Sequence, residues 1–397
     1  MIRRANHVQR TLIFGGEVLS CNGEATPQEA IVVDGGKIAA VGTLDDLKAL
    51  AGESAKTINV GGATILPGLV DTHPHAMHFS TLELSMVDLS DAQDHDDIIQ
   101  RVQQRAANTP EGQWIMCTPV GEAHYFHRRS YHDLSEGRLP DRHALDKASD
   151  AHPVMIQAWA PRLPSVVAMN SMALQTLGLS WHTPERVCDV WIDRDANGEL
   201  TGILRGSVTN YYTHDPFWMQ IWDKLPLPPD EIWEFGGRRG MAAMNALGVT
   251  TIYESHAMEP EHIYGYQKLH NDKAMSCRVL TSLESADVAF HPHYRPTPEQ
   301  LQARLELSLS MMELDDDYLR HNGITVARSG PCGSGFINLY EPFKSPYGEL
   351  IYGYEFLPKW VEEQAIDFCM EHGLRMNILA ATQKDHDSFF DSVEKHD

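Results

Sequence analysis

The sequence predicts an α/β protein built around a parallel barrel. From residue 230 onward, strand-like segments alternate regularly with helical segments, and repeated β-then-α units imply a parallel sheet that favours a barrel. An earlier apolar segment, which ends at His75, provides the first strand of that sheet. Residues 1–66 instead contain short strands separated by turn signals, which predicts a small antiparallel β domain ahead of the barrel.

The β domain contains a specific hairpin signal. Asp34-Gly35-Gly36 lies between two apolar runs, and these residue types accept the positive φ angles that tight hairpin turns require. A short helix is predicted over 45–50.

Between the first and second barrel strands the pattern is irregular. The predicted elements are a helix over 94–107, strands over 114–118 and 153–159, and a hairpin at Asn197-Gly198. We therefore expect an α/β insertion over residues 82–229, which leaves 67–81 and 230–397 for the barrel.

Beyond the insertion, the barrel pattern resumes. The second to fifth strands are predicted over 249–254, 276–283, 323–327 and 374–380. Gly248 and Gly373 end the helices that precede two of these strands, since glycine adopts the left-handed conformation that closes a helix. A loop rich in Gly, Pro and Tyr occupies residues 329–357.

His73 and His75 carry the first chemical signal. Alternate residues of a strand face the same side, so two imidazoles separated by one residue at a strand end converge on one metal ion. Functional groups of such barrels lie at the carboxyl ends of the strands. A second such pair, His291 and His293, lies in a proline-rich stretch and is expected to be loop.

These segments resemble the amidohydrolase superfamily. The first strand reads Pro67-Gly68-Leu69-Val70-Asp71-Thr72-His73-Pro74-His75, and the downstream stretches 152–154, 170–174, 198–204 and 248–251 are similar to the family 3 branch, which includes N-substituted formamide deformylases and exoenzyme-regulatory proteins. The resemblance covers residues 11–380. It implies a (β/α)₈ barrel, a β-sandwich built from both chain ends, and a divalent metal that activates water against an amide-type C–N bond.

The sequence departs from that family at two expected metal ligands. The family often carries a carboxylated lysine on the fourth strand, where this chain has Thr325, and a histidine at the end of the fifth, where it has Leu379. His386 follows several residues later.

Glu254, at the end of the second strand, can replace a missing ligand because a carboxylate oxygen ligates zinc. We therefore assign His73, His75 and Glu254 as metal ligands, with His256 as a weaker candidate. The alternative for Glu254 is a carboxylate that pairs with an arginine or caps the next helix. His124 and His127 could contact substrate or be ordinary loop residues.

The composition limits the partners. The net charge is 32 − 55 = −23 and no block of Lys and Arg occurs, which argues against nucleic-acid and membrane partners. We expect a cytoplasmic protein, because Arg3 and Arg4 precede too short an apolar run for a signal peptide. The 6 cysteines lie far apart, as expected for reduced thiols.

The sequence favours a zinc-dependent hydrolase of a small amide-type substrate, with metal below full occupancy because only two histidine ligands are secured. The alternatives are a catalytically degenerate binding or regulatory relative and an inactive fragment. Residues 385–397 alone follow the fifth strand, so we expect either a truncated product of a longer gene or a homo-oligomer in which another chain completes the barrel.

Overall fold

The computed structural model describes residues 9–23, 27–121, 129–158, 163–209, 212–226, 228–229, 231–287, 295–330 and 335–396. The chain divides into two compact units, Met1–Leu69 and Val70–Asp397. None of the described helices is both long and apolar enough to span a membrane.

The first unit is a four-stranded sheet with the order β3-β2-β1-β4. Its elements are β1 (Thr11–Val18), β2 (Gln28–Asp34), β3 (Lys37–Gly42), α1 (Leu44–Ala51) and β4 (Lys56–Asn59). The predicted hairpin is confirmed, because β2 and β3 pair antiparallel around Gly35 and Gly36, whose φ angles are 58° and 80°. One pairing differs from the antiparallel prediction. β4 runs parallel to β1, because α1 carries the chain back across the sheet before β4 begins.

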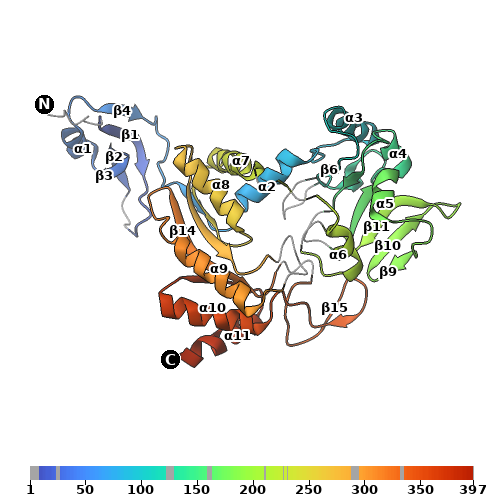
Figure 1. Ribbon diagram of the computed structural model, residues 1–397. Coiled ribbons are helices and arrows are strands. Elements are labelled where there is room, and N and C mark those ends of the chain that lie inside the picture. The colour runs from blue at the N-terminus through green and yellow to red at the C-terminus, as the bar shows by residue number, and fades with distance from the viewer. Residues whose placement is uncertain are drawn as a thin grey trace. The chain divides into compact units, whose positions relative to one another are not determined.

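The second unit contains a curved five-stranded sheet with the order β17-β14-β13-β12-β5 (Figure 1). Its strands are β5 (Leu69–Asp71), β12 (Val249–Glu254), β13 (Arg278–Glu284), β14 (Leu319–Ala327) and β17 (Met376–Leu379). β12, β13, β14 and β17 pair parallel, each with the next. The strand order is the one predicted from the sequence, and the sheet is the open half of an α/β barrel.

Helices connect and cover these strands. They are α7 (Ile232–Ala246), α8 (Pro260–Asn271), α9 (Pro298–Met311), α10 (Lys359–His372) and α11 (Gln383–Val393). Thr297 caps α9, since its side chain accepts a hydrogen bond from the Gln300 N–H and the Gln300 side chain accepts one from the Thr297 N–H.

A separate six-stranded mixed sheet lies within the second unit, in the order β6-β7-β8-β11-β10-β9. Its strands are β6 (Ile115–Cys117), β7 (Val154–Ile156), β8 (Ser165–Met169), β9 (Arg186–Val187), β10 (Val190–Arg194) and β11 (Leu200–Gly206), and its helices are α3 (His95–Ala106), α4 (Arg142–Asp146), α5 (Ser171–Leu177) and α6 (Pro216–Trp222). β10 and β11 form the hairpin that Asn197-Gly198 predicts. The insertion therefore has the α/β composition expected for it.

Helix α2 (Ala76–Ser85) packs tightly against α7, and glycines make this possible. A Cβ atom on Gly240 would lie 2.4 Å from the carbonyl oxygen of Ala76, and one on Gly236 would lie 1.7 Å from Thr81 Oγ1. Only glycine fits at such separations, so this contact fixes the beginning of α2 beside the carboxyl end of the five-stranded sheet.

Candidate metal centre

His73 and His75 follow β5 rather than end it. The strand stops at Asp71, whose side chain accepts a hydrogen bond of 3.0 Å from the His73 N–H. His75 has a left-handed backbone, with φ 48°, and immediately precedes α2. The two rings lie 4.9 Å apart between centroids. They are therefore neighbours, as predicted, but a turn rather than strand alternation brings them together.

His256, the weaker sequence candidate, completes a group of three imidazoles. It lies just beyond β12 and is buried. Its Nε2 lies 2.7 Å from Nε2 of His73, and its ring centroid lies 4.5 Å from that of His73 and 4.5 Å from that of His75. Residues separated by about 180 positions in the sequence thus converge at one point.

The pKa values of two of these imidazoles are lowered, which favours their neutral form. The pKa of His256 is well below its usual value, first because the ring is buried and then because His75, His73 and His78 surround it. His73 is more exposed, but its partial desolvation also lowers its pKa, although the Asp71 carboxylate opposes the shift. Neutral imidazoles retain the lone pair that a metal ion requires.

Glu254 lies against the first turn of α2. Its Oε1 accepts hydrogen bonds from the Met77 N–H at 3.2 Å and the Tyr266 hydroxyl at 2.8 Å. The capping role considered as an alternative is therefore real, but the helix is α2. Burial raises the pKa of the Glu254 carboxyl, and Oε2 is buried with no hydrogen-bond partner among the described residues. Buried polar atoms normally have a hydrogen-bond partner, so a buried carboxylate oxygen without one is expected to bind a water molecule or an ion.

His78 belongs to the same cluster and was missed in the sequence. It lies three residues after His75 on α2, and the pair could have been recognised from that helical spacing. Nδ1 of His262 accepts a hydrogen bond of 2.9 Å from the Glu259 N–H and therefore carries no proton. His78 Nε2 lies 3.3 Å from the same Nδ1, so it is the donor in the hydrogen bond between the two rings. The lone pair of neutral His78 is therefore on Nδ1. The pKa of His78 is well below its usual value because the side chain is buried.

Two overlapping groups of potential ligands result, and they share His75. One consists of His73, His75 and His256, the other of His75, His78 and Glu254. Within each group the ligand atoms lie within 4.8 Å of one another. Zinc binds imidazole nitrogen at about 2.0–2.1 Å and carboxylate oxygen at about 2.0–2.2 Å, so small side-chain adjustments would suffice. The donor types and the unpartnered Glu254 oxygen fit a divalent metal.

The positions that depart from the family pattern do not contribute ligands to either group. Thr325 is buried on β14, where its hydroxyl donates to the Ser255 carbonyl oxygen and lies 2.8 Å from Ser282 Oγ. Leu379 ends β17, and His386 is exposed on α11. His124, His127, His291 and His293 lie outside the described residues.

The chain belongs to the amidohydrolase family, whose sequence pattern it matches over residues 56–397. Residues 30–51 also match the imidazolonepropionase-like composite domain of bacteria. The resemblance inferred from the sequence is thereby confirmed.

Two known proteins are similar in sequence to this chain. An N-substituted formamide deformylase from Arthrobacter pascens is 27% identical over 224 residues, which cover 54% of this chain and 38% of that protein. Protein LONG AFTER FAR-RED 3 from Arabidopsis thaliana is 25% identical over 405 residues, which cover 98% of this chain and 62% of that protein. The chain thus spans less than two thirds of either relative.

A solved structure supports the fold. An uncharacterized metal-dependent hydrolase from Pyrococcus furiosus superposes with a TM-score of 0.65 at 19% sequence identity, covering 97% of this chain and 70% of that one. This likeness confirms the predicted α/β barrel fold.

Proposed function

We propose that this protein is a metal-dependent hydrolase that cleaves a non-peptide C–N bond in a small amide-type substrate. The observation that carries the proposal is the convergence of His73, His75 and His256 beside the unpartnered Oε2 of Glu254. Membership of the amidohydrolase family supports the same reaction class.

The side chains of the cluster have distinct roles in this proposal. His73, His75 and His256 would hold a divalent metal, with zinc suited to their nitrogen donors. Such an ion lowers the pKa of water and polarises a carbonyl oxygen. Glu254 would offer Oε2 to the same centre, while Tyr266 and the Met77 N–H hold Oε1 in place.

The substrate class is drawn from the family and one relative. Amide cleavage is the reaction named for the Arthrobacter pascens relative, which supports N-substituted formamides and other N-acyl amines as the first compounds to test. Cleavage would release a carboxylic acid and an amine.

The test compares metal content and turnover in the same preparations. The chain is stripped with a chelator, reloaded with zinc, manganese or cobalt, and assayed for amine release from N-formyl and N-acyl amines. We expect metal-dependent turnover that falls at least about 100-fold in His73→Ala and His256→Ala. His182→Ala, at an exposed histidine outside the cluster, should retain activity. Turnover that survives chelation, or that both cluster variants retain, would refute the proposal.

One observation favours a second candidate, a binding or regulatory relative without catalysis. Thr325, at the position of the family's carboxylated lysine, is committed to hydrogen bonds within the sheet. A chain that binds metal stoichiometrically yet hydrolyses none of these amides would support this second function.

A further inference from the structure

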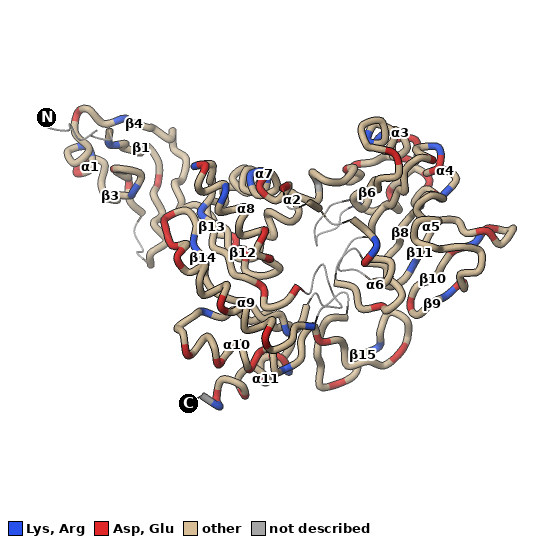
Figure 2. Tube along the Cα trace, in the orientation of Figure 1, with Lys and Arg blue, Asp and Glu red and all other residues tan. Residues whose placement is uncertain are grey.

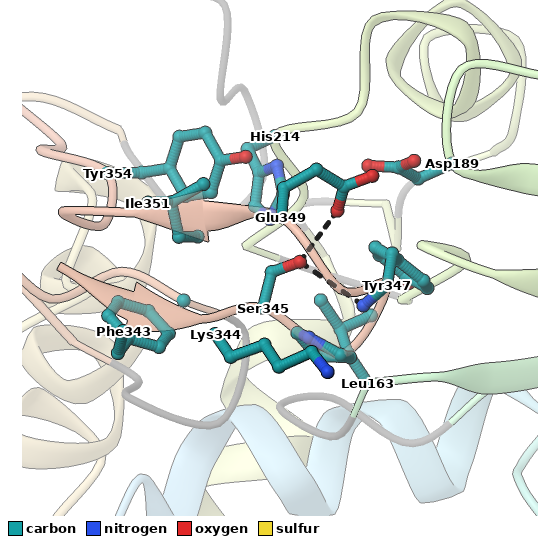
Figure 3. Close-up of a pocket in the computed structure, with 12 residues that line it drawn as sticks. Leu163, Asp189, His214, Phe343, Lys344, Ser345, Tyr347, Glu349, Ile351 and Tyr354 are labelled. Atoms are coloured by element: carbon teal, nitrogen blue, oxygen red, sulfur yellow. Dashed lines mark hydrogen bonds between the residues drawn. The ribbon is translucent and has the colours of Figure 1, made fainter.

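A cavity of about 470 Å³ lies in the second unit and is lined by residues other than those of the histidine cluster. One wall is the small hairpin of β15 (Phe343–Lys344) and β16 (Leu350–Ile351), within the long loop after β14. The other wall comes from the insertion and includes Asp189 and His214 (Figure 3). The volume is within the range of small-molecule sites, about 300–1,000 Å³. We call this cavity the hairpin pocket.

Specific contacts hold the two walls together. His214 stacks on Tyr354, with ring centroids 3.9 Å apart and an interplanar angle of 19°. The Tyr347 hydroxyl lies 2.9 Å from Ser207 Oγ, and the Tyr347 ring lies 5.3 Å from that of Trp191. The hairpin pocket is therefore formed by defined side-chain contacts between segments more than 100 residues apart in the sequence.

Two carboxylates lie at the same end of the hairpin pocket, as Figure 3 shows for Asp189 and Glu349. Arg186 pairs with Asp189 Oδ1 at 2.9 Å, and Ser345 Oγ donates to Glu349 Oε2 at 2.8 Å. The Glu349 carboxylate also accepts a hydrogen bond from its own backbone N–H, and no other described residue donates to either carboxylate. Two acceptors are thus available on opposite walls of one cavity.

Arg186 already balances part of the negative charge at this end, because it pairs with Asp189 and, after the Ser345 hydroxyl, contributes to the lowered pKa of Glu349. The three carboxylates of Asp189, Glu349 and Asp215 still exceed it in charge and favour a further cation. The pKa of Tyr354 is raised by burial and then by the carboxylates of Asp189, Glu349 and Asp215. Lys344 also lines the cavity, but Figure 3 shows its side chain directed away from Asp189 and Glu349. Acidic residues outnumber basic ones in the chain, 55 to 32, and Figure 2 shows them along most elements.

The other lining groups favour an apolar body next to that charge. Tyr354, Phe343 and Ile351 present aromatic and aliphatic surface. Aromatic faces attract cations within about 6 Å of the ring centroid, so Tyr354 can contribute to binding the charge as well as the carbon frame.

We propose that the hairpin pocket binds a small organic ammonium ion, with its nitrogen between Asp189 and Glu349 and its apolar part against Tyr354 and Phe343. A primary ammonium group has three N–H donors and can therefore serve both carboxylates at once. This site is separate from the histidine cluster, and binding there requires neither metal nor hydrolysis.

The test is calorimetric titration of the full chain with three compounds of similar size. Phenethylammonium carries the charge, 2-phenylethanol is its neutral analogue, and 3-phenylpropanoate is the corresponding anion. We expect the ammonium ion to bind about tenfold more tightly than the alcohol, the gain expected from two partly exposed ion pairs and one cation–aromatic contact. The anion should bind more weakly than either.

Variants assign the binding to the pocket. Asp189→Asn and Glu349→Gln should each weaken ammonium binding about two- to fivefold, as expected for one partly exposed ion pair, and leave alcohol binding unchanged. Glu341→Gln is the matched control, because Glu341 is exposed on the same loop but does not line the cavity. Unfolding temperatures of all variants show whether the fold is retained.

Several results would overturn the proposal. Equal affinity for the ammonium ion and the alcohol would remove the role of charge. Ammonium binding unchanged in both carboxylate variants would place it elsewhere. Preferred binding of the anion, lost in Lys344→Met, would assign the pocket to anions. Absence of saturable ammonium binding to a folded chain would refute the site, whereas loss of the proposed hydrolase activity alone would leave this binding unaffected.

Discussion

Replacing Gly240 by alanine tests whether the α2–α7 contact positions the histidine cluster. The new Cβ would lie 2.4 Å from the Ala76 carbonyl oxygen, whereas an ordinary contact needs at least 3.4 Å, so the helices must separate by about 1 Å. Overpacking costs about 1–3 kcal/mol, and alanine recovers up to about 1 kcal/mol in helix propensity. We expect a net loss of about 1–2 kcal/mol and, because Ala76 adjoins His75, zinc affinity reduced about tenfold or more.

Gly237→Ala is the matched control on the same helix. Its Cβ would meet the ends of the Met77 and Leu269 side chains, at 2.9 and 3.0 Å, and these flexible groups can move aside. Thermal unfolding and zinc titration should therefore distinguish the two variants. If Gly240→Ala and Gly237→Ala have the same unfolding temperature and zinc affinity, close helix packing does not position the cluster.

Two further changes probe buried groups near the cluster. Burial raises the pKa of Glu284 to about 8. Between about pH 4.5 and pH 8 the folded chain therefore retains a proton that the unfolded chain has lost, and the free energy of unfolding falls as the pH rises through this range. Glu284→Gln keeps an acceptor for the Ala257 N–H but does not titrate. Its unfolding temperature minus that of the parent chain should therefore be larger at about pH 8 than at about pH 5. The same difference at both pH values would contradict this account. Tyr266→Phe removes the hydroxyl that holds Glu254 Oε1 and should lower zinc affinity about tenfold, measured by competition with a chelator; unchanged affinity would show that the Met77 N–H suffices.

The order of the barrel elements could be predicted because local signals agreed along the chain. β12 occupies the predicted residues 249–254, and Gly248 and Gly373 have the positive φ angles expected at the helix ends, 81° and 67°. Apolar periodicity, glycine caps and β-branched runs are each formed by residues that are neighbours in the sequence. They can therefore be recognised in a single sequence.

The histidine cluster could be predicted only in part. His73 and His75 were recognisable from their spacing, but their convergence depends on the left-handed backbone at His75, which the strand pattern does not encode. The dual position of Glu254, as helix cap and potential ligand, depends on how α2 packs beside β12. His78 was missed because it lies on a helix beyond the recognised motif. Long-range packing, rather than local propensity, assembles these groups.

The tight pairing of α2 with α7 also has an evolutionary consequence. Gly240 faces Ala76 and Gly236 faces Thr81, so the two helices run in opposite directions and the end of α2 lies near the beginning of α7. The intervening chain leaves and rejoins the barrel at neighbouring points, the arrangement in which domain insertion is tolerated best. Because the entropy of closing a loop grows only slowly with its length, this segment can be lengthened, shortened or exchanged at little cost to the centre below it. Changes in the length of this segment can therefore leave the histidines in place.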